Sequence, residues 1–316
     1  MSFKLTTPIR LLTGGLLLIV LLLGVEYLLG WKAVLVPWSS LHPLQAVIAV
    51  ALVLASYVIR TLRLLYFFPG ELKQSLLPAL KLMLAHNFWN NLLPMRSGEI
   101  SFPILMQSYF RIGPGRSIPA LLWFRLLDFY AVFMLGVIAL MRSGNGIGIT
   151  LLLAAGFTAV IPLAWMLLPR LLRRVEARDS NLISRIAGNI RASFPSSWGS
   201  LYISTGWTLL NWAVKLAAFA WILAQFIAID ATTAVLGAIG GELTSVLPLH
   251  GIAGAGTYEA GIVVAMLPAG VEYRQALLAA VNLHIFVLSC ALLGGAASYL
   301  MPGKSIPVPS LRHQDR

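Results

Sequence analysis

The segment His86–Glu99, HNFWNNLLPMRSGE, decides how this chain folds. It places three asparagines, a proline, an arginine and a glutamate within a stretch that is otherwise apolar enough for a membrane. Hydrocarbon offers no partner to a polar group, so such a segment persists only when protein buries it or when it lines a wet cavity. The segment therefore predicts an interrupted helix, and its arginine and glutamate predict a functional site.

A second segment, Gly241–Gly261, has the same character with the sequence GELTSVLPLHGIAGAGTYEAG. The two segments lie inside two ambiguous regions, Ser75–Phe110 and Ala231–Ala269. Each region contains two short apolar pieces that are separated by Pro, Gly and polar residues. Each is therefore expected to form a broken hairpin rather than one continuous helix.

The composition indicates that this chain folds in a membrane rather than in water. Of its 316 residues, 59% are hydrophobic and only 11% are charged, whereas soluble domains carry about 25% charged residues. The net charge of +12 comes from basic residues between apolar stretches, which fits the positive-inside rule and contact with anionic lipid headgroups rather than with nucleic acid. The single Cys290 leaves no disulfide and no cysteine-based metal site within one chain.

Six stretches are long and apolar enough to span a bilayer as helices: Leu11–Trp31, Leu44–Phe68, Ile118–Met141, Ile147–Leu168, Ser200–Ile227 and Ala276–Leu300. The first resembles a signal peptide, but its length and the lack of an A-x-A site favour an uncleaved span. With the two broken hairpins, these spans predict an all-α polytopic membrane protein.

The distribution of basic residues predicts how the chain runs. If Ser75–Phe110 enters and leaves on the cytoplasmic side, then all five basic groups become cytoplasmic. These groups are Lys4 with Arg10; Arg60, Arg63 and Lys73; Arg111 with Arg116; Arg170 to Arg191; and Lys304 to Arg316. The same reasoning makes Ala231–Ala269 a re-entrant hairpin from the outside, and it places both termini in the cytoplasm.

The resulting order predicts an inverted-topology repeat within a single membrane domain that covers residues 1–316. Its half-repeats would be residues 1–142 and 143–301, followed by a cytoplasmic tail, 302–316. Leu93-Pro94 and Leu247-Pro248 mark corresponding positions in the two hairpins, as in transporters whose broken helices meet at the midplane. The alternative is that hydrophobic hairpins share these features without any repeat.

Two further segments are interpreted from their charge. Residues 170–194 combine arginines with Leu182, Ile183, Ile186 and Ile190 at helical spacing, so they form either an interfacial amphipathic helix or a loop that only sets the topology. Arg60 and Arg63 lie near the cytoplasmic end of their span, where they are expected to snorkel towards water. His86 is expected at the interface.

The first hairpin supplies most of the candidate substrate-binding residues. Arg96 offers a planar donor fork for a phosphate or carboxylate, and Glu99 would neutralise it or carry a proton; alternatively, the two pair only with each other. Three asparagines, Asn87, Asn90 and Asn91, either satisfy the ends of the broken helix or bind a headgroup.

Further candidates come from the next span and the second hairpin. Arg125 and Asp128 share one helix face at i, i+3; they either form an internal pair, including one with the first hairpin, or place a second cation on the substrate path. Glu242, His250, Tyr258 and Glu259 accompany Gly251, Gly254 and Gly256, whose backbone amides could approach an anion. Glu259 would titrate, counter Arg96 or Arg125, or serve only as a helix cap.

Catalytic signatures are lacking in the sequence. It contains no H-E-x-x-H, P-loop or G-x-S-x-G motif, no Cys/His ligand set and no aspartate cluster. A His86/Glu99 acid–base pair is the one conceivable catalytic arrangement. We therefore expect no enzymatic activity, no catalytic residue, no metal and no cofactor.

The motifs NNLLPMRSGE, FRLLDFYAV and LPLHGIAGAGTYEAG, in this order, resemble the lysylphosphatidylglycerol synthase/flippase transmembrane-domain family. The resemblance covers nearly the whole chain, although His250 stands where a smaller residue would be expected. It implies a domain that moves lipids or lipid-linked groups across the bilayer. Some members carry a soluble aminoacyl transferase; the present sequence ends at Arg316 without one, so lysyl-lipid synthesis is not expected.

These expectations combine into a flippase-like transporter of an anionic or zwitterionic lipid in the bacterial inner membrane. Arg96 and Arg125 would bind the phosphate, while Glu99, Asp128 and Glu259 would balance the charge. The first alternative is a non-transporting membrane partner of a lipid or glycan synthase, and the second is a membrane-embedded transferase. Membrane lipids are the expected partners, nucleic acid is not, and the sequence leaves the oligomeric state open.

Overall fold

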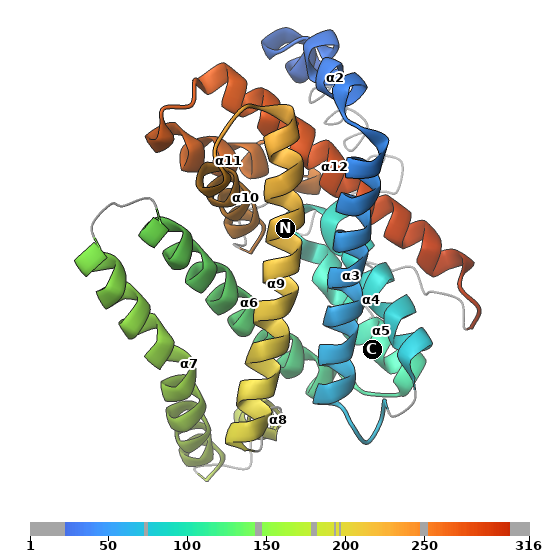
Figure 1. Cartoon of the computed structure of the whole chain (residues 1–316). Coiled ribbons are helices and arrows are strands. Elements are labelled where there is room, and N and C mark those ends of the chain that lie inside the picture. The colour runs from blue at the N-terminus through green and yellow to red at the C-terminus, as the bar shows by residue number, and fades with distance from the viewer. Residues whose placement is uncertain are drawn as a thin grey trace, which may run out of the picture.

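The computed structural model describes residues 23–72, 75–142, 147–177, 182–192, 194–195, 197–246 and 252–303. All regular elements in these ranges are helices (Figure 1). A short helical stretch at 23–28 precedes α2 (Trp31–Ser40). The predicted all-α class is therefore confirmed for this part of the chain.

Five helices of the described ranges are long and apolar enough to cross a membrane. They are α3 (Pro43–Phe67), α6 (Pro114–Arg142), α7 (Ile147–Glu176), α9 (Trp198–Phe226) and α12 (Tyr273–Leu300). Their bounds agree with the predicted spans, except that α7 continues well beyond Leu168. Most of the sixth predicted span, Leu11–Trp31, lies outside the described residues.

The two ambiguous regions are both broken into pairs of shorter helices. The first contains α4 (Leu76–Leu92), the 3-10 helix η1 (Pro94–Ile100) and α5 (Ser101–Phe110). Pro94 lacks an N–H and disfavours helical backbone in the residue before it. Leu93 is accordingly extended, with φ −81° and ψ 139°, so α4 stops at the polar segment.

The second region contains α10 (Ala231–Val246), η2 (Ile252–Gly254), α11 (Thr257–Met266) and η3 (Leu267–Ala269). Residues 247–251, with Pro248, lie outside the described ranges. In both regions the predicted interruption is thus present. That the pairs are re-entrant in a bilayer stays a prediction.

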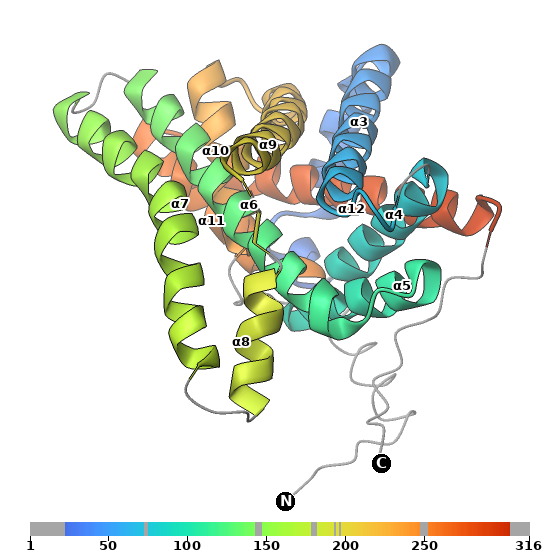
Figure 2. The same cartoon turned by 90° about the horizontal axis from the view of Figure 1, so that it is seen from below.

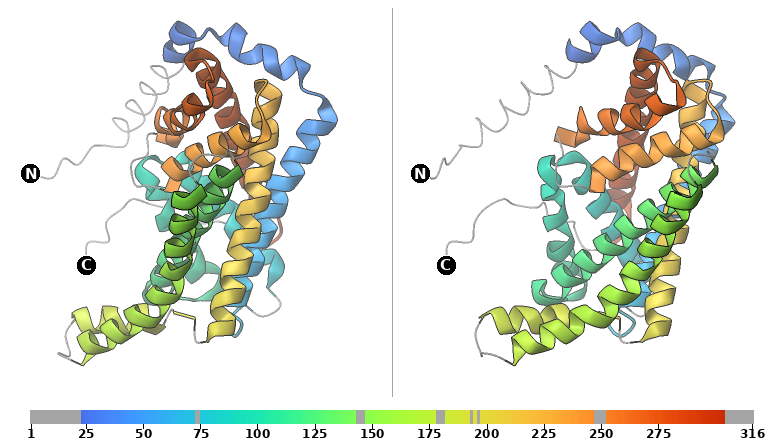
Figure 3. Two further views of the ribbon diagram at one scale, coloured as in Figure 1. Left: turned by 60° about the vertical axis from the view of Figure 1, so that its left-hand side comes forward. Right: turned by 90° about the vertical axis from the view of Figure 1, so that its left-hand side faces the viewer.

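The two helix pairs lie on opposite halves of the molecule and meet at their tips, which are the segments around η1 in the first pair and η2 in the second. Figure 3 shows α10 and α11 in the upper half, and α4 and α5 below them. The 3-10 helices η1 and η2 contact each other, and α3 packs along α9. Viewed from below, α3 and α9 stand beside the crossing α12 (Figure 2).

The packing of the first half has a counterpart in the second. Helix α4 packs against α3 and α12, whereas α10 packs against α9 and α6. Helix α5 contacts α6, and α11 contacts α12. Each helix pair therefore packs on the last long helix of the other half: the first pair packs on α12, and the second pair packs on α6. A repeat would produce this correspondence, although the inverted repeat itself stays a prediction.

Glycines allow α10 and α11 to approach very closely. A Cβ atom added to Gly240 would lie 2.2 Å from the carbonyl oxygen of Gly261, and one added to Gly261 would lie 2.4 Å from the carbonyl oxygen of Gly240. No real side chain fits at such distances. The small residues therefore fix the separation of the second helix pair.

The basic segment at 170–194 does not form one helix. Helix α7 continues to Glu176, and a separate α8 (Leu182–Ala192) follows. The two are joined by an ion pair between Arg191 Nε and Glu176 Oε2 at 2.9 Å. Ile183 and Ile186 are exposed on α8, as an interfacial helix requires.

Candidate functional site

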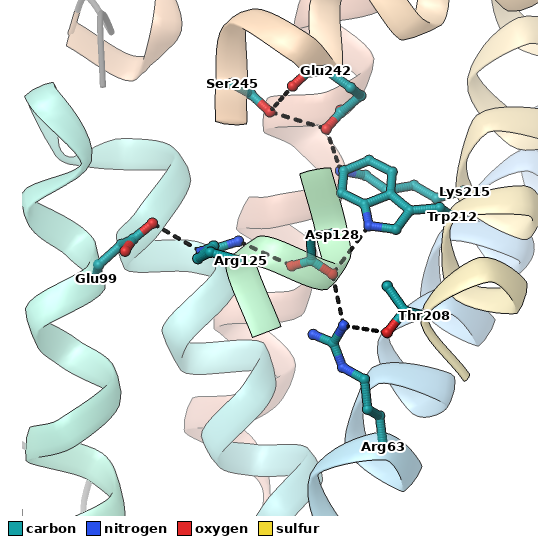
Figure 4. A network of polar contacts seen from close by, with 9 residues as sticks. All are labelled: Arg63, Glu99, Arg125, Asp128, Thr208, Trp212, Lys215, Glu242 and Ser245. Carbon is teal, nitrogen blue, oxygen red and sulfur yellow. Dashed lines mark hydrogen bonds and ion pairs between the residues drawn. The ribbon is translucent and has the colours of Figure 1, made fainter. Parts of the chain in front are cut away.

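Asp128 on α6 is the centre of a buried polar network (Figure 4). Its Oδ1 lies 2.7 Å from Arg63 Nη1 on α3, and it accepts a hydrogen bond of 3.1 Å from Trp212 Nε1 on α9. The same Arg63 nitrogen donates to Thr208 Oγ1 on α9 at 2.9 Å. The side chains of Arg63 and Asp128 are only 3% and 2% exposed. One carboxylate thus joins three long helices.

Arg125 connects this centre to the tip of the first helix pair. Its Nη1 lies 3.4 Å from Asp128 Oδ2, and its Nε lies 3.0 Å from Glu99 Oε1 on η1. The latter is a charge contact, because its geometry does not meet that of a hydrogen bond. Both internal pairings considered for Arg125 are therefore present, within its own helix and with the first hairpin.

A second buried ion pair lies beside the first. Lys215 Nζ on α9 is 2.9 Å from Glu242 Oε2 on α10, and Ser245 donates to the same oxygen at 3.1 Å. The ammonium also lies 4.8 Å from the centroid of the Trp212 ring. Lys215 was missed in the sequence analysis, although a lysine in the middle of an apolar span was a usable signal.

The prediction that Arg60 and Arg63 snorkel to water is wrong. They are 9% and 2% exposed and lie on the buried face of α3. They occupy positions i and i+3 of that helix, so both point towards the interior where α3 packs on α9. Their place near a helix end in the sequence did not reveal that the neighbouring helices cover them.

Arg60 has no hydrogen-bond or ion-pair partner among the described residues, and its Nε is fully buried. It lines a cavity of about 20 Å³ together with Arg63, His86, Arg125 and Asp128. This volume holds about one water molecule. Among the described side chains of this network, four are cationic and three anionic: Arg60, Arg63, Arg125 and Lys215 against Glu99, Asp128 and Glu242. These described side chains therefore carry one excess positive charge.

The asparagines of the first hairpin stay outside this network. Asn87 donates to the hydroxyl of Tyr57 at 2.9 Å, and Asn91 donates to the carbonyl of Asn87 at 2.8 Å. The Oδ1 of Asn90 is buried without a hydrogen-bond partner in the described structure. His86 is not interfacial as expected, since it is 3% exposed and its Nδ1 lies 2.8 Å from Ser101 Oγ.

Two predicted site residues cannot be placed. The side chain of Arg96 and the whole of His250 lie outside the described part of the structure. Nothing in the structure therefore tests the predicted role of Arg96 as a phosphate ligand. Its backbone belongs to η1, the same tip that carries Glu99.

Glu259 contributes to a separate polar cluster at the tip of the second pair. Its Oε1 lies 2.7 Å from His284 Nδ1 on α12, and its Oε2 accepts a hydrogen bond of 2.8 Å from the backbone N of Gly256. The centroid of the Tyr258 ring lies 4.7 Å from that of His284, with the two rings tilted by 36°. The buried hydroxyl of Tyr258 has no hydrogen-bond partner within the described residues. Glu259 therefore pairs with His284 rather than with Arg125. His284, also in an apolar span, was missed.

The arrangement suits anion binding better than metal binding. Within the described residues, no group of three or more His, Cys, Asp or Glu side chains could hold a metal ion. The excess cation instead faces a small cavity between α3, α4, α5 and α6, all of which belong to the first half of the chain. Chemically, such a site can receive one anionic group.

Comparison with known proteins agrees with the motifs. The family described as "Lysylphosphatidylglycerol synthase TM region" matches residues 10–295. No curated protein and no solved structure matches the chain significantly. The match covers most of the sequence, including every residue of the buried network. The chain is a multi-pass membrane protein that belongs to the family of lysylphosphatidylglycerol synthase transmembrane regions.

Proposed function

We propose that the protein is a flippase-like transporter that moves an anionic or zwitterionic lipid, or a lipid-linked group, across the bacterial inner membrane. The observation that carries this proposal is the buried network with one uncompensated cation, Arg60, beside the tip of the first helix pair. Removing one partner from a buried ion pair is costly because a charge is left unpaired. A substrate phosphate would supply the missing negative charge.

The size of the cavity indicates how such a substrate would enter. A volume of about 20 Å³ does not hold a phosphate headgroup. Binding would therefore need the tip of the first pair to move away from α6, and the contact between Glu99 on η1 and Arg125 on α6 is one connection that would open. Movement of one half against the other would then expose the site alternately to the two leaflets.

This role is tested by reconstituting the purified protein into vesicles with fluorescently labelled phosphatidylglycerol. Arg60→Gln should reduce the rate of translocation by about tenfold or more, the equivalent of about 1.4 kcal/mol. Arg60→Lys should retain part of the activity, because it keeps the charge. Arg116→Gln is the matched control, since Arg116 pairs with Glu71 at an exposed site.

Three outcomes would overturn the proposal or part of it. Wild-type rates in Arg60→Gln would show that the excess cation does not bind substrate. Wild-type rates in both Arg96→Ala and Glu99→Gln would exclude the tip of the first pair from the site. Wild-type protein that moves no labelled lipid, but co-purifies with a lipid or glycan synthase, would favour the non-transporting partner.

A further inference from the structure

His284 lies between two groups that both accept hydrogen bonds. Its Nδ1 is 2.7 Å from Glu259 Oε1, and its Nε2 is 2.8 Å from the backbone carbonyl oxygen of Ala253. The side chains of His284 and Glu259 are 8% and 12% exposed. A carbonyl and an ionised carboxylate accept but never donate.

Counting protons gives a definite result for this cluster. A neutral imidazole carries one N–H, so it can donate to Glu259 or to Ala253, but not to both. Both contacts are satisfied only when the pair holds one more proton. That proton sits either on the ring, as an imidazolium beside a carboxylate, or on Glu259, which then donates to Nδ1.

We propose that Glu259 and His284 form a single-proton binding site that latches the tip of the second helix pair. With the proton bound, His284 on α12 holds both α11, through Glu259, and the η2 segment, through Ala253. Loss of the proton removes one of these two hydrogen bonds. The latch should therefore be closed at low pH and open as the pH rises.

The backbone at the tip makes the contact with Ala253 consequential. Ala253 has φ 51°, a left-handed conformation that non-glycine residues seldom adopt without support. Gly254 and Gly256 follow with φ 83° each. Releasing the carbonyl of Ala253 would let this segment relax, and η2 is the part of the second pair that contacts η1.

Other ionisable groups around the site have separate partners. From α10, Glu242 pairs with Lys215 of α9; from the segment before α2, Glu26 accepts a hydrogen bond from the Trp31 backbone N. The ring of Tyr258 contacts the His284 ring in a tilted arrangement, and Glu99 on η1 pairs with Arg125. At the start of α12, Glu272 accepts from backbone N atoms of its own first turn.

The proton count can be measured directly. Protein labelled with ¹⁵N-histidine and ¹³C-glutamate would report the ring nitrogens of His284 and the carboxyl of Glu259 by NMR, with Glu259→Gln and His284→Ala used for assignment. At low pH we expect one of two results. Either the His284 ring carries two N–H groups beside an ionised Glu259, or the ring carries one N–H group beside a protonated Glu259. A neutral ring beside an ionised carboxylate at every pH from 5 to 9 would overturn the proposal.

The latch is tested by hydrogen exchange at residues 252–259, corrected for the intrinsic pH dependence of exchange. Protection in the wild type should fall by about tenfold or more as the pH rises, as expected for losing a hydrogen bond that involves a charged group. Glu259→Gln mimics the protonated acid and should stay protected throughout. His284→Ala should be unprotected throughout, and Glu272→Gln should behave like the wild type. Equal protection of the wild type at all pH values would refute the latch.

In transport, this inference rests on the function proposed above, with the bound proton as the coupling ion. A pH gradient should change lipid translocation by the wild type but not by Glu259→Gln; an equal response in both would refute the coupling. The two proposals fail separately. Should Arg60→Gln translocate lipid normally, the substrate site is wrong, whereas the NMR and exchange measurements would still decide the proton site.

Discussion

Asp128 contacts two cationic side chains and one indole N–H, and its own side chain is only 2% exposed. Asp128→Ala would leave Arg63 buried without its carboxylate, so unfolding in detergent should become easier by about 3–5 kcal/mol. Glu71→Ala is the control, because its pair with Arg116 is exposed and such pairs contribute about 0–1 kcal/mol. Similar losses for the two variants would contradict the structural role given to Asp128.

Asp230, at the start of α10, is a pH-sensitive helix cap. The hydroxyl of Thr233, then the backbone N–H groups of Thr233 and Thr232, lower the pKa of Asp230. A carboxylate with a lowered pKa stabilises the fold above its ordinary pKa, and this stabilisation is lost as the pH falls through the lowered value. Thermal unfolding of Asp230→Ala should therefore differ from wild type at neutral pH and converge with it in acid. A difference that persists unchanged in acid would exclude the carboxylate as its source.

At the scale of elements, the interface between α10 and α11 depends on two glycines. Gly240→Ala and Gly261→Ala would push Cβ atoms into backbone carbonyls, so each should destabilise the protein by about 1–3 kcal/mol. Gly206→Ala on α9 meets nothing within 4 Å and should instead stabilise it by about 0.5–1 kcal/mol. Chemical or thermal unfolding in detergent measures all three. The change in unfolding free energy should therefore have opposite signs at the interface and at Gly206. A stabilising Gly240→Ala would refute the close packing.

The elements themselves were largely readable from the sequence. Pro94 and its polar neighbours predict the end of α4, because a proline cannot continue the hydrogen bonds of a helix. Apolar length predicts the five long helices, because about 20 residues are needed to cross hydrocarbon. A separate interfacial helix after the fourth span was one of the two interpretations of residues 170–194, but the position of the break between α7 and α8 was not predicted. The spacing of Ile183, Ile186 and Ile190 fits a helix that extends in either direction.

At the scale of the whole molecule, orientation in the membrane is open to a direct test. Single cysteines are introduced into a Cys290→Ala background at four exposed positions: Ser40, Gly70, Ser197 and Ala269. If the two halves have opposite topology with cytoplasmic termini, an impermeant thiol reagent should label Ser40→Cys and Ala269→Cys in intact cells. Gly70→Cys and Ser197→Cys should react only after the membrane is opened. Labelling of Gly70→Cys and Ala269→Cys from the same side would exclude the opposed hairpins.

The sequence by itself determined that the chain folds in a membrane, that it is helical, where its helices break and to which family it belongs. These properties follow from local patterns: apolar length, proline and glycine, and short polar motifs. It also indicated that Glu99, Arg125 and Asp128 act inside the protein, because charges in an apolar span need an interior partner.

Only the tertiary structure decided which charges meet. Arg60 and Arg63 are buried because residues of α4, α5, α6 and α9 surround their face of α3. Lys215 meets Glu242, and His284 meets Glu259, each across two neighbouring helices rather than within one helix. Nearly every face of these helices is apolar, so periodicity cannot show which face packs inward. The rotation of each helix is set by packing against its neighbours. That rotation leaves Arg60 without a counter-ion in the described structure and places His284 between two acceptors.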